Sequence, residues 1–222
     1  MSITAEQLLE HYPNRAEKLA DLWIHAIGIA AALIGGGVLI DRAMSTGGGG
    51  LTLATGLYAL CLIAMLASSA AFNLSRPCAA RSLLRRLDYA GIFLMIAGSY
   101  TPFTSQGFAG GSAAATTALV WMVALGGAAG NLLAKKPPGS LWTLIYMGFG
   151  GLALSMVRPL IADLPRSAFV LLVTGGLIYA AGTLVLHSRL PYRRAIWHGF
   201  VIAAAGLHYG AVFSGVVLAG RA

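Results

Sequence analysis

The sequence predicts an all-α integral membrane protein with seven transmembrane helices, a cytoplasmic N-terminus and a periplasmic C-terminus. Of its 222 residues, 58% are hydrophobic and only 10% are charged. Long apolar runs recur along the chain, and the basic residues gather in alternate connections between them. This combination is typical of membrane proteins and excludes an ordinary soluble domain. The net charge of +8 is spread between apolar runs, so nucleic acid is not an expected partner.

Residues 1–21 are predicted to form a cytoplasmic amphipathic segment ahead of a membrane domain at 22–222. The segment is acidic and lacks the basic start of a cleaved secretory signal. The first apolar run is therefore expected to remain in the membrane as a helix.

Each membrane span needs about 20 apolar residues to cross the hydrocarbon core. The predicted spans are 22–40, 51–73, 88–108, 112–133, 140–157, 167–187 and 195–219. A Gly-rich turn, Ser45–Gly50, is expected between the first two. Asp88 is the single formally charged residue within these spans when histidines are counted as neutral.

The basic residues predict the orientation. With a cytoplasmic N-terminus, eleven of the 15 Lys and Arg residues fall in inside segments and four fall outside. Cytoplasmic loops carry such an excess, and the alternation requires an odd number of spans. Trp23, Trp142 and Trp197 then lie near cytoplasmic helix ends, as expected of an interfacial aromatic belt.

The stretch Arg85–Phe103 reads RRLDYAGIFLMIAGSYTPF and places Asp88 at the start of an apolar run. A carboxylate in a membrane helix is costly unless it has a partner, so Asp88 is a candidate functional residue. The alternative is that Asp88 caps the third helix and pairs with Arg85 or Arg86 at the membrane surface.

Other polar residues are expected at the same depth as Asp88. They are Ser69 and Asn73 at the end of the second span, His25 in the first span and His198 in the last. His208 lies ten residues beyond His198, roughly 15 Å deeper. Two histidines and a carboxylate are able to bind a divalent metal or to relay protons. The alternative is that each histidine is a hydrogen-bonded packing residue.

Four segments resemble the hemolysin III family, the bacterial branch of the progestin and adipoQ receptor superfamily. They are EKLADLWIHAIGIAAAL, SSAAFNL, LLRRLDYAGIFLMIAGSYTPF and IWHGFVIAAAGLHYGAV, in the family's order and spacing. The resemblance implies a multi-pass protein of the bacterial cytoplasmic (inner) membrane, with seven helices and membrane lipids as partners. The family name implies cytolysis, but no residue here indicates a pore.

The resemblance also implies a zinc site, from which this sequence departs. In the family, a serine and a histidine four apart end the second helix, an aspartate opens the third, and HxxxH opens the seventh. Ser69 and Asp88 match these positions, and Asp88 would hold the zinc-bound water. Of the three histidine ligands only His198 remains, because Asn73 and Arg194 occupy the other two positions.

An asparagine oxygen is a poor substitute for imidazole on zinc, and an arginine repels a dication. No bound cofactor is therefore expected, and Arg194 is predicted to form an ion pair with Asp88. A substitute zinc site built from His25, Asp88 and His198 remains as an alternative.

Three functions fit these residues. The first is a hemolysin III-type protein that acts in membrane lipid or energetic homeostasis, with a degraded zinc site. The second is a metal-dependent hydrolase of a lipid amide, in which the metal activates water beside Asp88. The third is a proton or small-solute pathway through Asp88, His198 and His208.

Overall fold

The computed structural model describes residues 12–46, 48–106, 112–133, 140–152, 162 and 164–219. Over this part of the chain the protein is all-helical, which confirms the all-α part of the predicted fold class. The helices are α2 Arg15–Thr46, α3 Gly48–Leu74, α4 Arg81–Gln106, α5 Ser112–Leu133, α6 Ser140–Gly151, α8 Arg166–Leu186 and α9 Arg193–Val212. A short π-helix, η2 Phe213–Val217, continues α9.

Five segments are long and apolar enough to cross a membrane: Arg15–Thr46, Gly48–Leu74, Ala114–Leu133, Arg166–Leu186 and Arg193–Val217. They confirm a multi-pass helical membrane protein. α4 is not among them, and three arginines and Asp88 lie in its first turns. The described part of α6 has only 12 residues. The full set of seven spans remains a prediction, and residues 153–157 of the expected span 140–157 lie outside the described residues.

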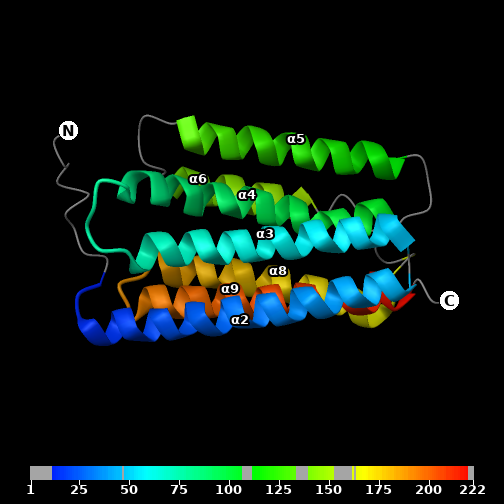
Figure 1. Ribbon diagram of the computed structural model, residues 1–222. Helices are drawn as coiled ribbons and strands as arrows, with labels where there is room; N and C mark the ends of the chain where they lie inside the picture. Colours follow the sequence, from blue (N-terminus) through cyan, green and yellow to red (C-terminus); the bar gives the residue numbers. More distant parts are fainter. Residues whose placement is uncertain are drawn as a thin grey trace.

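The helices form a bundle in which sequence neighbours pack side by side. α2 lies between α3 and α9, α3 packs on α4, and α8 packs on α9. α5 lies at the outside of the bundle against α4 (Figure 1). α2, α4 and α9 begin at the same end of the bundle, and α3 ends there (Figure 1). This end is called the polar end below.

Two helices begin earlier than their apolar runs predict. α2 begins at Arg15 because Asn14 and Glu17 cap it: the Glu17 amide donates to Asn14 Oδ1 at 2.9 Å, and Asn14 Nδ2 donates to Glu17 Oε1 at 3.2 Å. α4 begins at Arg81, so Asp88 lies about two turns inside the helix. The alternative that Asp88 caps the third helix is therefore wrong.

The Gly-rich turn between the first two helices is shorter than predicted. α2 continues through Thr46 and α3 starts at Gly48, which leaves little of the expected turn Ser45–Gly50. Gly48 has a φ of 72°, a left-handed conformation that glycine adopts without steric cost.

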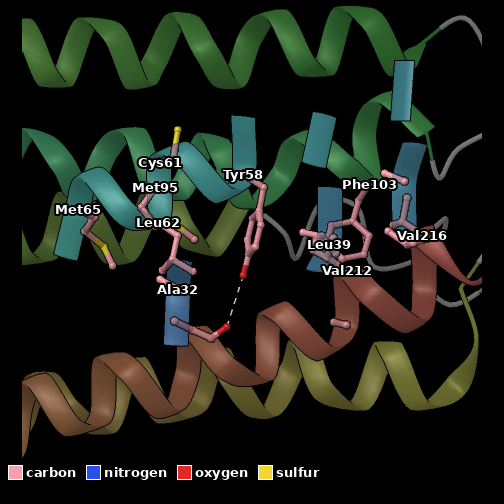
Figure 2. Packing of buried hydrophobic residues seen from close by; sticks show 14 of the residues in the cluster. Ala32, Leu39, Tyr58, Cys61, Leu62, Met65, Met95, Phe103, Val212 and Val216 are labelled. Atoms are coloured by element: carbon pink, nitrogen blue, oxygen red, sulfur yellow. Dashed lines mark hydrogen bonds between the residues drawn. The ribbon is translucent and has the colours of Figure 1, made fainter. Parts of the chain in front are cut away.

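The main core lies between α2, α3, α4 and α9 (Figure 2). Tyr58 of α3 is fully buried, and its hydroxyl donates a long hydrogen bond of 3.5 Å to the Ala205 carbonyl of α9 (Figure 2). Small residues bring α3 and α4 close together. A Cβ added at Gly98 of α4 would lie 2.7 Å from Cys61 Cβ of α3. Such close approach is typical of membrane helices.

The outer surface is apolar. Trp23, Ile27 and Ile34 of α2 are 60–71% exposed, and Leu184 of α8 is 76% exposed. A soluble monomer rarely exposes apolar side chains on this scale, whereas lipid solvates them without cost. The polar groups described next lie inside the bundle.

Candidate functional site at the polar end

Asp21 of α2 and His198 of α9 form the shortest polar contact between helices in this region. The Asp21 carboxyl is fully buried, and its Oδ1 lies 2.6 Å from His198 Nδ1. The Tyr12 hydroxyl donates to Asp21 Oδ2. Both carboxyl oxygens are thus satisfied, which a buried carboxylate requires. The contact fixes the His198 ring with Nδ1 toward Asp21.

His25 lies beside His198, and its Nδ1 also faces Asp21. The two ring centroids are 4.3 Å apart in an edge-to-face contact. His25 Nδ1 lies 2.9 Å from the Asp21 backbone carbonyl oxygen. The Nε2 atoms of both histidines lie 3.4 Å from the Ser69 hydroxyl oxygen. Two imidazole nitrogens therefore converge on one serine.

Ser69 and Asn73 lie one turn apart on α3 and share a face, as their spacing predicts. Asn73 Nδ2 donates to the Ser69 backbone carbonyl at 3.0 Å and lies 3.3 Å from Ser69 Oγ. A side-chain hydrogen bond joins Ser69 to Asp88 of α4. The serine is thus the point where α2, α3, α4 and α9 meet.

Arg194 enters the site from the first turn of α9. Its Nη1 donates to Asn73 Oδ1 at 3.4 Å, and its charge acts on the Asp88 carboxyl. Tyr192, just before the helix, has a left-handed backbone with a φ of 58°. α9 therefore starts at an abrupt turn, close to Asn73 and Arg194. The Asp88–Arg194 ion pair itself remains a prediction.

Arg86, one of the two arginines before Asp88, has a hydrogen-bond partner on α5. Arg86 Nη1 donates to the Leu132 carbonyl at 2.8 Å. This bond satisfies a carbonyl at the C-terminal end of α5, where a cation is also favoured by the helix dipole. Arg86 therefore joins α4 to α5.

Asp21 and Tyr12 are functional candidates that the sequence reasoning missed, since both lie in the segment expected to be a cytoplasmic extension. Burial, followed by the hydrogen bond to Asp21, raises the pKa of the Tyr12 hydroxyl, so it stays protonated as a donor. Asp21 precedes His25 by four residues and so shares its helix face. The four-residue spacing of Asp21 and His25, at the start of the first apolar run, is the sequence signal that identifies Asp21 as a candidate.

His208 lies away from this cluster. Its Nε2 is 3.2 Å from the Leu172 carbonyl oxygen of α8, and its ring packs edge-on against Tyr179. A Cβ added at Gly175 would lie 2.4 Å from the His208 ring. His208 therefore joins α9 to α8.

A cavity of about 730 Å³ opens from the polar cluster into the bundle. Its polar lining includes His25, Ser69, Asp88, Arg194 and His198. Most of the remaining wall is apolar and comes from α3, α4, α8 and α9. The cavity is thus amphipathic, with charged groups at the polar end and apolar walls beyond them.

The family's zinc ligand positions do not fit the metal here. Arg194 places a guanidinium beside Asn73, so two of the three positions offer a cation and an amide oxygen. A different set has suitable donors: ligand atoms of Asp21, His25 and His198 all lie within 4.8 Å of one another. Two histidines and a carboxylate form catalytic zinc sites in other proteins.

The fold and the site define a multi-pass helical membrane protein with a buried Asp–His–Ser cluster facing an internal cavity. The chain belongs to the family described as Haemolysin-III related, whose sequence model matches residues 14–209. It is 28% identical to a Hemolysin-3 homolog of Bacillus subtilis (strain 168) over 190 residues, which cover 85% of this chain and 89% of the relative. It is also 28% identical to Hemolysin-3 of Bacillus cereus, over 87% of this chain and 89% of the relative.

A human protein is similar over a comparable length. The Monocyte to macrophage differentiation factor of Homo sapiens is 28% identical over 208 residues, covering 90% of this chain and 85% of the relative. The similarity to these three relatives therefore covers 85–90% of this chain.

Proposed function

We propose that this chain is a seven-span protein of the bacterial inner membrane that binds a lipid inside its bundle and acts in membrane lipid homeostasis. The cavity is the observation that carries the proposal. Its volume of about 730 Å³ lies within the range of small-ligand pockets. Its apolar walls suit one acyl chain, and a lipid can enter from the surrounding bilayer.

The polar end of the cavity suits the head of such a lipid. Arg194 and His198 line it there, together with Ser69. A guanidinium favours a carboxylate or phosphate oxygen, whereas hydroxyl and imidazole groups hydrogen-bond a carbonyl. The expected ligand is an amphiphile with one chain in the apolar part and an oxygen-rich group beside Arg194.

Filling the cavity tests the proposal. Gly176 of α8 lines the cavity, and a Cβ added there meets nothing within 4 Å. The Gly176→Phe variant should therefore fold, and its phenylalanine ring should exclude the acyl chain from the cavity. Native mass spectrometry of the purified protein should find about one lipid per chain, and Gly176→Phe should lose it.

Gly126→Phe on α5 is the matched control, because Gly126 has equal free space but does not line the cavity. It should keep the lipid. If no lipid is bound by the unmodified protein, or if both variants retain it equally, the cavity is not a lipid site.

A metal-dependent lipid amide hydrolase is the second candidate function, favoured by the three donors of Asp21, His25 and His198. A divalent metal held there would supply an activated water. Elemental analysis of the purified protein tests it. About one zinc per chain, lost on His198→Ala, would support this candidate, and less than a tenth would count against it.

A further inference from the structure

Asp21, His198 and Ser69 are in hydrogen-bond contact in series, and the lipid-binding proposal assigns no reaction to that series. Asp21 Oδ1 is 2.6 Å from His198 Nδ1, and His198 Nε2 is 3.4 Å from Ser69 Oγ. The carboxylate holds the proton on Nδ1, so the lone pair of Nε2 faces the serine hydroxyl. This is the order of groups that activates a serine as a nucleophile.

We propose that Ser69 is the nucleophile of a metal-independent acyl hydrolase, with His198 as general base and Asp21 as the residue that positions His198. The substrate class is an ester or amide of a fatty acid whose chain fills the cavity, so the inference rests on the proposed lipid binding. Ser69 lines that cavity.

In the first step, Ser69 Oγ forms a bond to the acyl carbon while its proton moves to His198 Nε2. The carbonyl electron pair moves onto the oxygen, giving a tetrahedral oxyanion. When the carbonyl re-forms, the bond to the alcohol or amine breaks, and that group takes the proton from His198. Water then repeats the sequence at the acyl-serine and releases the fatty acid.

The two residues that replace the zinc ligands have a function in this scheme. Asn73 Nδ2 lies 3.3 Å from Ser69 Oγ, and Arg194 is held at Asn73 Oδ1. An amide N–H and a cation therefore lie beside Ser69 Oγ, to which the carbon bearing the oxyanion would be bonded. Donors fixed at that place stabilise the transition state. In this scheme the Arg194 guanidinium supplies the positive charge that stabilises the oxyanion.

Two other groups, His25 and Asp88, also contact Ser69. His25 Nε2 is also 3.4 Å from Ser69 Oγ, but its Nδ1 lies closer to the Asp21 backbone carbonyl, at 2.9 Å, than to the Asp21 carboxylate, at 3.5 Å. Asp88 of α4 also forms a hydrogen bond with Ser69. We assign the base to His198 because its Nδ1 lies 2.6 Å from Asp21 Oδ1, whereas His25 Nδ1 lies 3.5 Å from Asp21 Oδ2.

A long-chain alkyl fluorophosphonate tests the nucleophile. The full-length protein is incubated with it in lipid nanodiscs containing EDTA, and the adduct is located by peptide mass spectrometry. We expect one adduct per chain, on Ser69. The adduct position is measured on the unmodified protein, so the result does not depend on the folding of a variant.

Variants then assign the roles. His198→Gln should slow labelling by roughly 10²–10⁴-fold, the usual contribution of a general base. Asp21→Asn should also slow it, and Asp21→Glu should recover part of the rate. The partial recovery of the labelling rate by Asp21→Glu is the readout that a merely structural role of Asp21 would not give. Ser99→Ala is the matched control, because Ser99 lines the same cavity with its hydroxyl bonded to the Ile96 carbonyl at 2.7 Å.

A protein that binds lipid but gives no adduct on Ser69 would overturn this inference and leave the proposed function standing. A protein that binds neither lipid nor the probe would overturn both. Labelling unaffected by His198→Gln would also overturn the inference. Lipid hydrolysis abolished by EDTA and restored by zinc would do the same and favour the metal-dependent candidate.

Discussion

At the scale of single residues, the site joins the two residues that stand where the resemblance implies zinc-binding histidines. Two family histidine positions hold Asn73 and Arg194, and the structure joins them by a hydrogen bond of 3.4 Å. The retained histidine, His198, gains Asp21 as its partner. The polar residues stay connected through Ser69, because each buried polar group still needs a hydrogen-bond partner.

The predicted ion pair between Asp88 and Arg194 leads to a thermodynamic cycle. Removing one partner of a buried pair costs about 3–5 kcal/mol, because it leaves the other charge unpaired. Asp88→Asn and Arg194→Gln alone should each lower the thermal stability of the protein in detergent. The double variant should recover part of the loss.

Arg86→Gln is the control for that cycle, since Arg86 donates to the Leu132 carbonyl. Its effect should add to that of Asp88→Asn without recovery. Equal and additive losses from Asp88→Asn and Arg194→Gln would contradict the ion pair.

Restoring the two ligand positions should restore metal binding. Asn73→His with Arg194→His rebuilds the family's three histidines around Asp88 and removes the cation beside them. We expect about one zinc per chain in this double variant by elemental analysis, and less than a tenth in the unmodified protein. Adding His198→Ala should abolish the zinc gained. A double variant that stays free of zinc would mean that the backbone at these positions no longer suits the metal.

At the scale of helices, the apolar runs predicted most of the bundle because each span must satisfy its own backbone hydrogen bonds. The span 112–133 coincides with α5, and α8 is displaced from its predicted span by one residue at each end. The polar starts of α2 and α4 could not be found in this way, because hydropathy does not register helical turns outside the apolar run. Asp21 was missed for the same reason.

Close packing of α3 on α4 gives a prediction at this scale. A Cβ at Gly98 would lie 2.7 Å from Cys61 Cβ, so Gly98→Ala must push the two helices apart. Overpacking of this kind costs about 1–3 kcal/mol, although alanine is the better helix former. A fall in thermal stability in detergent should follow.

Gly126→Ala on α5 is the matched variant, because its Cβ would meet nothing within 4 Å. It should be neutral or slightly stabilising. If both alanine variants behave alike, the α3–α4 contact is not packed as closely as the structure has it.

At the scale of the whole molecule, the bundle places its polar groups asymmetrically. His25, Asp88, Arg194 and His198 line one cavity, and Asp21 contacts His198. These residues belong to α2, α4 and α9, which begin at the polar end (Figure 1). Arg81, Arg85 and Arg86 begin α4 at the same end. Positive residues accumulate on cytoplasmic surfaces, so the polar end is expected to face the cytoplasm. The predicted site would then meet lipids of the inner leaflet.

This orientation predicts a cytoplasmic N-terminus and a periplasmic C-terminus. Reporter fusions test it, with alkaline phosphatase active only in the periplasm and green fluorescent protein fluorescent only in the cytoplasm. Fusion after Ala222 should give phosphatase activity without fluorescence, and fusion within Arg189–Arg194 should give the reverse. The pair is internally controlled, since α9 lies between the two fusion points. A fluorescent fusion after Ala222 would contradict the orientation and place the Ser69 site at the periplasmic face.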